Sequence, residues 1–128
     1  MDSRRESVAP AVHKVMTAAE RAGLSQERQD DLAVAVSEAL SNAAVHGNGL
    51  KPGTHVHVSI RVQPGERFTV EVADRGPGFD AADVHDPTDP ARVLLPGGRG
   101  VYLMRRLVDE LEYNPPGNCV RLTMRLDR

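Results

Sequence analysis

The segment Glu38-Ala-Leu-Ser-Asn42-Ala-Ala-Val-His46-Gly47 decides how the rest of the chain is interpreted, because it combines a polar and an apolar helical stripe. Glu38, Asn42 and His46 are four residues apart and therefore share one side of a helix. The apolar positions of the same helix lie on a different side and form its buried stripe: Leu32, Val36, Ala39 and Ala43. The pattern predicts a helix from Gln26 to about His46, ended by Gly47-Asn48-Gly49.

The residues before this helix predict a second helix packed beside it. Apolar side chains recur at helical spacing from Val8 to Ala19, Pro10 suits a first turn and Gly23 suits a helix end. We therefore expect a helix over about residues 8–22. Ser25 then has the position of an N-cap for the next helix.

The residues after residue 50 predict a sheet. Apolar and polar residues alternate over 56–62 and again over 68–72, with the turn 63–66 between them, which is typical of an antiparallel hairpin. Further on, the pattern predicts a helix, an extended stretch and a last strand: 100–108, 110–113 and 120–126. Helices first and strands clustered after them favour an α+β fold, a two-layer α/β sandwich with helices on one face of a mixed or antiparallel sheet.

Length and composition limit the classes of function. A chain of 128 residues predicts a single domain, 1–128, and a net charge of -2 with 3 % aromatic residues gives no reason to expect a nucleic-acid partner. No apolar run approaches the roughly 18 residues of a membrane span, and residues 1–7 are polar, so we expect a cytoplasmic protein without a membrane partner. The single cysteine, Cys119, lies in an alternating run and is interpreted as a strand residue.

The first motif offers metal and acid–base chemistry. The amide oxygen of Asn42 is a hard ligand suited to Mg²⁺, and the carboxylate of Glu38, one turn earlier, can accept a proton from an attacking hydroxyl. Taken alone, the same stripe also fits a solvated helix face.

The second motif, Asp74-Arg-Gly76-Pro-Gly78-Phe79, begins where an apolar strand ends. A carboxylate at Asp74 can accept a hydrogen bond from the exocyclic amine of adenine, and it is a poor partner for the O6 of guanine. Gly76 and Gly78 allow the close approach that a pocket wall against a flat ring requires. A plain Asp-Gly turn explains this motif equally well in isolation.

The third motif, Gly97-Gly-Arg-Gly100-Val-Tyr-Leu-Met104, opens a helix with glycines. Gly98 and Gly100 would leave N–H groups and the positive end of a helix dipole free for phosphates. Arg99 could add a charge-assisted contact to the terminal phosphate. A flexible loop with a helix cap is the alternative interpretation.

In this order and on these predicted elements, the three motifs resemble the N, G1 and G2 boxes of the GHKL ATPase superfamily with its Bergerat nucleotide-binding fold. Within it the chain most resembles the anti-sigma-factor serine/threonine protein kinases, over roughly residues 8–126. The resemblance implies ATP and Mg²⁺ as cofactors. Such kinases bind a sigma factor, phosphorylate a small STAS-type anti-sigma antagonist protein, and are commonly homodimers.

The resemblance also implies a role for each matching residue. Glu38 would be the general base, Asn42 would bind Mg²⁺, and Asp74 with Gly78 would hold adenine. Residues 79–99 would form a lid, with Gly98 and Gly100 contacting phosphates. His46 matches the end of the first box and is interpreted as structural.

The N-terminal segment departs from the pattern of the family. The apolar strand that usually precedes the first helix is short or absent, because residues 1–7 are polar. If that strand helps to form the sheet edge or the dimer contact, both would differ in this chain.

Two alternative functions stay open: a non-catalytic nucleotide-binding module that captures a partner protein, and a histidine-kinase-type catalytic domain. His55 and His57 share a strand face and are interpreted as exposed residues.

Overall fold

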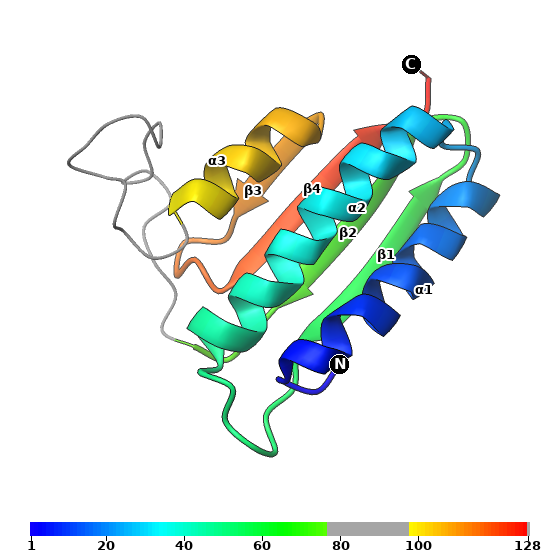
Figure 1. Cartoon of the computed structure of the whole chain (residues 1–128). Coiled ribbons are helices and arrows are strands. Elements are labelled where there is room, and N and C mark those ends of the chain that lie inside the picture. Colours follow the sequence, from blue (N-terminus) through cyan, green and yellow to red (C-terminus); the bar gives the residue numbers. More distant parts are fainter. Residues whose placement is uncertain (77–97, 128) are drawn as a thin grey trace.

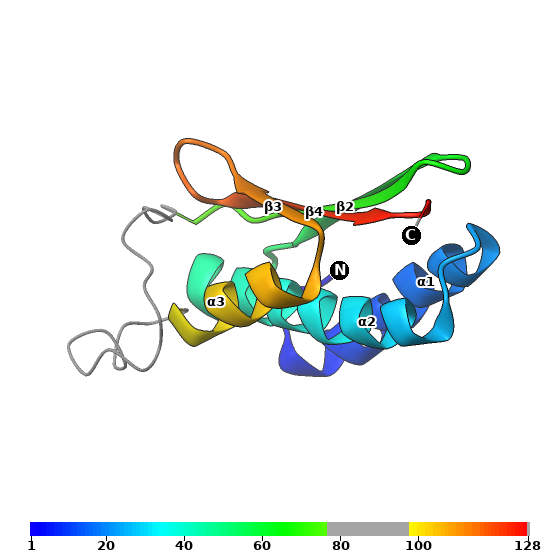
Figure 2. The same ribbon diagram turned by 90° about the horizontal axis from the view of Figure 1, so that it is seen from above.

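The computed structural model describes residues 1–76 and 98–127, which form two layers. A four-stranded sheet makes one layer, and the helices cover one of its faces, as the two views in Figures 1 and 2 show. The helices are α1 (Val8–Arg21), α2 (Gln26–Ser41) and α3 (Gly98–Leu107), and a short 3-10 turn η1 (Arg5–Ser7) precedes them. The predicted α+β two-layer sandwich is confirmed.

The strands pair in the order β1-β2-β4-β3 and are antiparallel throughout. Their bounds are β1 (His57–Gln63), β2 (Arg67–Ala73), β3 (Glu110–Tyr113) and β4 (Cys119–Arg125). The predicted hairpin is the β1–β2 pair, and Cys119 is a half-buried strand residue as expected. The sheet is therefore two local hairpins joined by the long-range β2–β4 ladder.

An aliphatic core lies between the layers. The predicted stripe of α2 is confirmed, since its four residues are all at least 95 % buried: Leu32, Val36, Ala39 and Ala43. The largest side chains in this core are Phe68, Leu32, Leu40, Met104, Leu122 and Met124. Strand β1 contributes less than its alternation suggests. Ile60 and Val62 remain about 40 % exposed because β1 is an edge strand, with β2 on one side only.

The start of α2 is fixed by two kinds of contact. The Ser25 hydroxyl accepts a hydrogen bond from the Arg28 N–H at 3.3 Å, which is the predicted N-cap. The Arg28 guanidinium also donates to Asp109 at 2.9 Å, and the side chain of Asp109 is only 5 % exposed. The same carboxylate accepts the N–H of Arg125 at 2.7 Å. This ion pair ties the first turn of α2 to the end of α3 and to β4.

The end of the long helix differs from the prediction. Instead of a regular α-helix to His46, a π-helical turn η2 (Asn42–Gly47) follows α2 directly. In it the N–H of Asn48 donates to the Ala43 carbonyl, five residues earlier, at 2.8 Å. A π turn widens the helix and changes where its side chains point, and such turns are frequent at functional sites.

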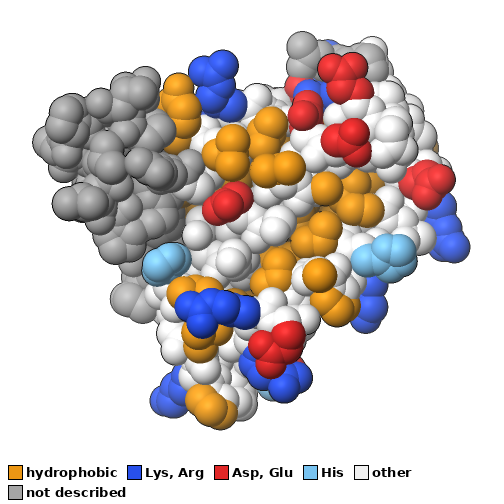
Figure 3. Space-filling model, viewed as in Figure 1, with side chains coloured by type: hydrophobic (Ala, Val, Ile, Leu, Met, Phe, Trp, Pro, Cys, Tyr) orange, Lys and Arg blue, Asp and Glu red, His pale blue; other side chains and the backbone are white. Residues whose placement is uncertain are grey.

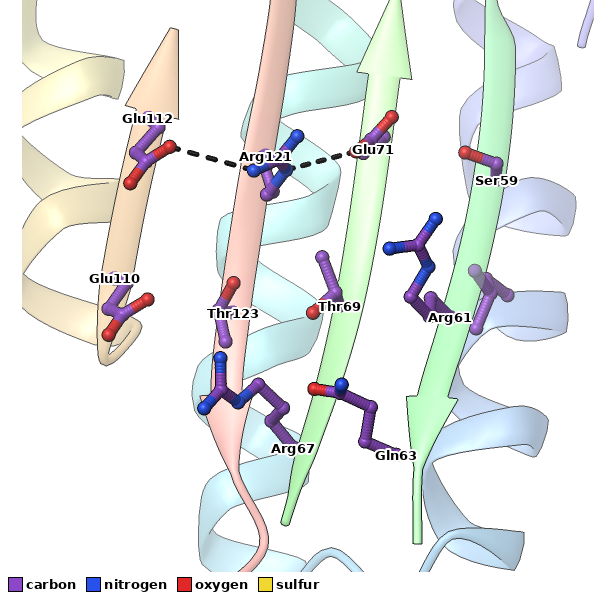
Figure 4. A pocket seen from close by; sticks show the side chains of 11 residues that line it. Ser59, Arg61, Gln63, Arg67, Thr69, Glu71, Glu110, Glu112, Arg121 and Thr123 are labelled. Carbon is purple, nitrogen blue, oxygen red and sulfur yellow. Dashed lines mark hydrogen bonds and ion pairs between the residues drawn. The ribbon is translucent and has the colours of Figure 1, made fainter.

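The other face of the sheet is polar, and none of the described helices covers it. Figure 4 shows a shallow hollow on this face in which Arg121 lies between two carboxylates, Glu71 at 3.0 Å and Glu112 at 3.7 Å. All three side chains are more than a third exposed, so these ion pairs add little stability. Because α2 packs on the opposite face, this hollow is separate from Glu38 and Asn42.

The N-terminal segment makes a single bridge to the sheet, as its polar sequence predicted. Asp2 pairs with His55 in one isolated antiparallel bridge, and the His55 imidazole lies 3.0 Å from the Asp2 carboxylate. His57 is exposed, as expected. Within the described ranges, no helix is long and apolar enough to cross a membrane.

Candidate nucleotide-binding site

The first and third motifs meet where α2 packs against α3. A Cβ placed on the buried Gly100 would lie 2.8 Å from Oε2 of Glu38 and 3.0 Å from Nδ2 of Asn42. The carboxylate and the amide therefore lie directly against the first turn of α3, at a distance that only a glycine allows. An acid, an amide and a helix N-terminus from two of the motifs therefore lie together, and the roles of these residues toward a ligand stay predictions.

Glu38, Asn42 and Gly100 form a corner between α2 and α3, which we call the nucleotide corner. The second motif approaches this corner from the sheet. Asp74 follows β2 directly, its N–H donates to the Asn118 carbonyl at 2.9 Å, and its Oδ1 accepts the N–H of Gly76 at 2.7 Å. Burial raises the pKa of the Asp74 carboxyl, and the hydrogen bond from Gly76 opposes that rise. The carboxylate is thus partly desolvated and held by a tight turn, and among the described residues its one hydrogen bond is the one that Oδ1 accepts.

Gly47 and Gly76 bring the π turn and the strand end together. A Cβ on Gly47 would collide with the carboxylate of Asp74, and a Cβ on Gly76 would collide with the carbonyl of Gly47. The sequence predicted close approach at Gly76, but it assigned that approach to a flat ligand. In the structure Gly76 lies against the backbone of the π turn, which fixes where Asp74 stands relative to Asn42, and its role beside a ligand stays a prediction.

Asn48 is the residue that sequence reasoning missed. Its amide donates to Ser3 Oγ and to the His55 carbonyl, both at 3.0 Å, and its Oδ1 accepts the N–H of Arg75 at 2.9 Å. It is one of the few buried polar side chains among the described residues. It therefore joins the N-terminal segment, the approach to β1 and the Asp74 turn. Its only signal in the sequence is an Asn between two glycines, which was interpreted as a helix end.

Two further asparagines, Asn114 and Asn118, support the other side of the Asp74 turn. Asn118 donates from its amide to the Gly76 carbonyl at 3.2 Å, and it also accepts from the Asn114 amide at 2.8 Å. Oδ1 of Asn114 accepts three backbone N–H groups of the β3–β4 turn, from Gly117, Asn118 and Cys119. The sequence predicted this turn, but not that it braces the site.

Several predicted residues fall outside what the structure describes. Gly78 and the predicted lid, residues 79–99, lie outside it except for the backbone of Gly98 and Arg99, which forms the first turn of α3. The Arg99 side chain lies outside the described part as well. His46 is exposed in the π turn and stays a structural prediction.

The described residues fit a nucleotide with a divalent cation. The Gly100 contact leaves Glu38 and Asn42 beside a helix N-terminus, which favours phosphate. Asp74 stands at the rim of the same corner, and no described residue donates a hydrogen bond to its second carboxylate oxygen. An amide near a carboxylate is an oxygen-donor set of the kind that Mg²⁺ takes, usually together with phosphates and water.

Comparisons with known proteins agree with this site. Residues 1–124 match the family described as "Histidine kinase-like ATPase domain". The chain belongs to this family, which is the GHKL class that the three motifs predicted.

Similarity to individual proteins places the chain in a smaller group within this family. The chain is 38 % identical over 117 residues to the serine-protein kinase RsbW of Bacillus subtilis, covering 85 % of this chain and 72 % of that protein. It is 31 % identical over 102 residues to the serine-protein kinase RsbW of Oceanobacillus iheyensis, covering 75 % of this chain and 64 % of that protein. Within its family the chain is therefore placed with the RsbW serine-protein kinases, and it spans about two thirds to three quarters of their length.

A solved structure supports the fold. The histidine kinase domain of the blue-light activated histidine kinase from Erythrobacter litoralis EL346 superimposes with a TM-score of 0.58 at 27 % identity. The match covers 78 % of this chain and 45 % of that one. The two-layer arrangement of helices on an antiparallel sheet is thus shared with a histidine-kinase ATPase domain.

Proposed function

We propose that the chain is an ATP-dependent serine/threonine protein kinase of the anti-sigma-factor type, acting with Mg²⁺. The observation that carries the proposal is the contact of Glu38 and Asn42 with Gly100. This contact puts an acid and a metal-ligating amide against the helix N-terminus suited to phosphate. The relatives at 31 % and 38 % identity, both named serine-protein kinases, support the same activity.

The residues divide the chemistry between two sides of the corner. Bound ATP with Mg²⁺ would supply the γ-phosphoryl group, with ADP as the leaving group. Glu38 would accept the proton of the serine or threonine hydroxyl as that oxygen attacks the γ-phosphorus, and Asn42 would hold Mg²⁺. The start of α3 holds the phosphates through three residues: Gly98, Arg99 and Gly100.

Asp74 selects the base. Its Oδ1 already accepts from Gly76, so Oδ2 is the oxygen left to accept the exocyclic amine of adenine. Guanine offers a carbonyl oxygen at the same ring position, which would face a carboxylate without a shared proton. In the proposal, Gly78 lies beside Asp74 against the adenine ring, and residues 79–99 form the lid.

The partners follow the family. We assign a sigma factor as the protein that the kinase sequesters, and a STAS-type anti-sigma antagonist protein as the acceptor of the phosphoryl group. A homodimer, a cytoplasmic location and a single domain over 1–128 belong to the same proposal. No described feature favours a non-catalytic nucleotide-binding module, and the RsbW relatives match at higher identity than the histidine kinase domain.

Calorimetry of ATP and GTP, with and without Mg²⁺, tests the pocket. We expect the wild type to bind ATP in a Mg²⁺-dependent way and to leave GTP unbound, and Asp74→Asn to lose ATP binding. The Asn side chain still offers an oxygen to Gly76, so the turn survives while the charge at the base is removed. Failure of the wild type to bind ATP would overturn the proposal.

Phosphoryl transfer to the antagonist protein tests catalysis. Glu38→Gln keeps the shape of the side chain and removes the base, so transfer should fall by about 10²-fold or more while ATP binding persists. Equal transfer rates in the two proteins would remove Glu38 from the role of base. ATP binding by a wild type without any transfer would instead support the nucleotide-binding module.

A further inference from the structure

Two of the three buried polar side chains among the described residues, Asn48 and Ser3, bond to each other. Asn48 is 9 % exposed and Ser3 is 2 % exposed, and the Asn48 amide donates to Ser3 Oγ at 3.0 Å across 45 residues of sequence. Figure 3 shows charged and hydrophobic side chains sharing the surface of the helix layer, whereas this bond lies inside the molecule. Burying polar groups costs free energy of desolvation, so the contact calls for an explanation beyond the apolar core.

The Asn48 side chain is held at every polar atom. Its amide also donates to the His55 carbonyl at 3.0 Å, and its Oδ1 accepts the N–H of Arg75 at 2.9 Å. Both amide hydrogens and the amide oxygen are therefore engaged. The backbone is fixed as well, because the Asn48 N–H donates to the Ala43 carbonyl and the Asn48 carbonyl accepts from Lys51. The side chain thus projects from a rigid point directly after η2.

The bond to Arg75 bears on Asp74, the residue that we propose for base selection. The N–H of Arg75 belongs to the peptide unit that joins it to Asp74, and a peptide unit is planar and rigid. Asn48 therefore fixes the peptide plane on one side of the Asp74 Cα. The plane on the other side is fixed by the Asp74 N–H, which donates to the Asn118 carbonyl at 2.9 Å. With both planes held, the direction of the Asp74 side chain is set.

Close packing of Gly47 against Asp74 cannot replace this bond. The contact at Gly47 excludes positions that lie too close, but it prefers no orientation among the positions that remain. A hydrogen bond requires an angle as well as a distance. The orientation of Asp74 therefore depends on Asn48 more than on the glycine before it.

We propose that Asn48 is a positioning residue that orients Asp74 toward the base and couples nucleotide binding to the attachment of the N-terminal segment. This inference rests on the proposed function and deepens it. Ser3 is attached to the residues before β1, because its N–H donates to the Thr54 carbonyl at 3.1 Å, and its hydroxyl holds the Asn48 amide. Coupling acts in both directions, so bound ATP should also strengthen the attachment of Ser3.

The preference for adenine measures the orientation of Asp74. Purine riboside triphosphate carries a hydrogen atom in place of the exocyclic amine, so it cannot donate to the carboxylate. For the wild type we expect its Kd to exceed that of ATP by about tenfold, the effect of one hydrogen bond to a charged group. Asn48→Ala should lower this ratio toward one. It should also raise the KM for ATP and leave kcat unchanged, since Glu38 and Asn42 keep their places.

Two further variants separate positioning from a general loss of structure. Ser3→Ala removes one acceptor of the Asn48 amide and keeps the bond to Arg75, so its ratio should lie between those of wild type and Asn48→Ala. This mild variant decides the question should Asn48→Ala not fold. Ser25→Ala is the matched control, because it removes one side-chain acceptor at the other end of the helical segment. Its ratio should equal that of the wild type.

Hydrogen exchange measures the coupling without any activity. The N–H of Ser3 bonds to the Thr54 carbonyl, and the N–H of Val56 bonds to the Met1 carbonyl. We expect ATP to slow the exchange of both amides by about fivefold in the wild type. In Asn48→Ala their exchange should be faster and should not respond to ATP.

Each outcome separates this inference from the function on which it rests. A wild-type ratio in both Asn48→Ala and Ser3→Ala would overturn the inference and leave the kinase. A ratio lowered equally in Ser25→Ala would overturn it in favour of general loosening. Exchange that ATP does not slow in the wild type would overturn the coupling to the N-terminal segment. Equal binding of the two nucleotides by the wild type would overturn base selection by Asp74, and binding of neither would overturn the proposed function itself.

Discussion

The two ends of the long helical segment 26–47 are built in different ways. At the start, a serine cap and a buried ion pair close the helix regularly, with Ser25 and Asp109 as the partners of Arg28. At the other end the helix widens into the π turn η2, and Gly47 lies so close to Asp74 that no side chain fits. The start is closed by a local cap and an ion pair, whereas the shape of the other end is set by close packing against the turn that follows β2.

Because of this difference, we expect the start of the helical segment to contribute mainly to stability and its other end to contribute mainly to ligand binding. The start carries charge pairs and a cap that hold the layers together. The π turn leaves a polar corner between helix and sheet, at which Asn42 and Asp74 can serve a ligand. Substitutions at the two ends should therefore have separable effects, which the following experiments test.

The largest loss of stability is expected from Asp109→Ala. The substitution removes the nearer of the two described carboxylates paired with the Arg28 guanidinium, which is 25 % exposed and then keeps only Asp31 at 3.4 Å. It also removes the acceptor of the Arg125 N–H. The free energy of unfolding should fall by about 3 kcal/mol, measured by urea denaturation. The ATP Kd of the folded fraction should not change, since Arg28 and Asn42 are about 21 Å apart along the helix.

Asp109→Asn is the control for this experiment, because it keeps an oxygen for Arg125 and removes the charge. It should recover part of the lost stability. A strong effect of Asp109→Ala on ATP affinity would contradict the separation of the two ends.

Gly76→Ala should damage the other end. The added Cβ collides with the carbonyl of Gly47, so the strand end or the π turn must shift. We expect a cost of about 2 kcal/mol from overpacking. We also expect a loss of ATP affinity of about tenfold or more, which corresponds to about 1.4 kcal/mol. Calorimetry of ATP binding measures the second effect, and an unchanged Kd would show that the π turn can move without disturbing the pocket.

Ser25→Ala tests the cap at the regular end. Removing the hydroxyl leaves the Arg28 N–H without its side-chain acceptor, so the free energy of unfolding should fall by about 1 kcal/mol. Ser25→Asp, which can still cap, should restore it. Thermal denaturation of the three proteins is sufficient, and ATP binding should be the same in all of them.

The smallest effect, and one of opposite sign, is expected for the stability of Asp74→Asn. Burial raises the pKa of the Asp74 carboxyl in the folded state above the usual value for an aspartic acid. The folded state then holds its proton to higher pH than the unfolded state does, so the wild type loses stability as the pH rises above about 4. Asp74→Asn lacks this loss and should be at least as stable as the wild type at pH 7.

The measurement is the difference in unfolding free energy between wild type and Asp74→Asn at pH 4 and at pH 7. The advantage of the variant should be larger at pH 7. An advantage that is larger at pH 4 would mean that the carboxylate is stabilised, not penalised, by its surroundings. A variant that is stable but does not bind ATP would show that the wild type keeps this charge for its ligand.

Local patterns were sufficient to predict most elements of the fold. The helical stripe that includes Leu32 and Val36, the Ser25 cap and the β1–β2 hairpin each follow from residues that are close in sequence. The contact of Glu38 with Gly100 is different, because the chemistry of each motif marks its own residue but not the neighbour of that residue. Glu38 and Gly100 are 62 residues apart in the sequence, and only the resemblance to a family indicated that they meet.

What could not be predicted depends on contacts between distant segments. The π turn forms where the helix end must fit against Asp74, and no local propensity marks it. Asn48 gains its role only when Ser3, His55 and Arg75 come together around it. The exposure of Ile60 follows from the position of β1 at the sheet edge, which the alternation of its residues does not encode.

The strand order β1-β2-β4-β3 also has a consequence for how the chain folds. Each hairpin closes a short loop, whereas the β2–β4 ladder, from Arg67 opposite Arg125 to Ala73 opposite Cys119, joins segments about 50 residues apart and carries a larger closure entropy. The Asp74–Asn118 bond lies at the end of that ladder. We therefore expect the hairpins to form early and the nucleotide corner to be completed last. In stopped-flow refolding, binding of a fluorescent ATP analogue should lag behind the circular-dichroism signal, so that a newly made chain acquires its ligand only after the sheet is whole.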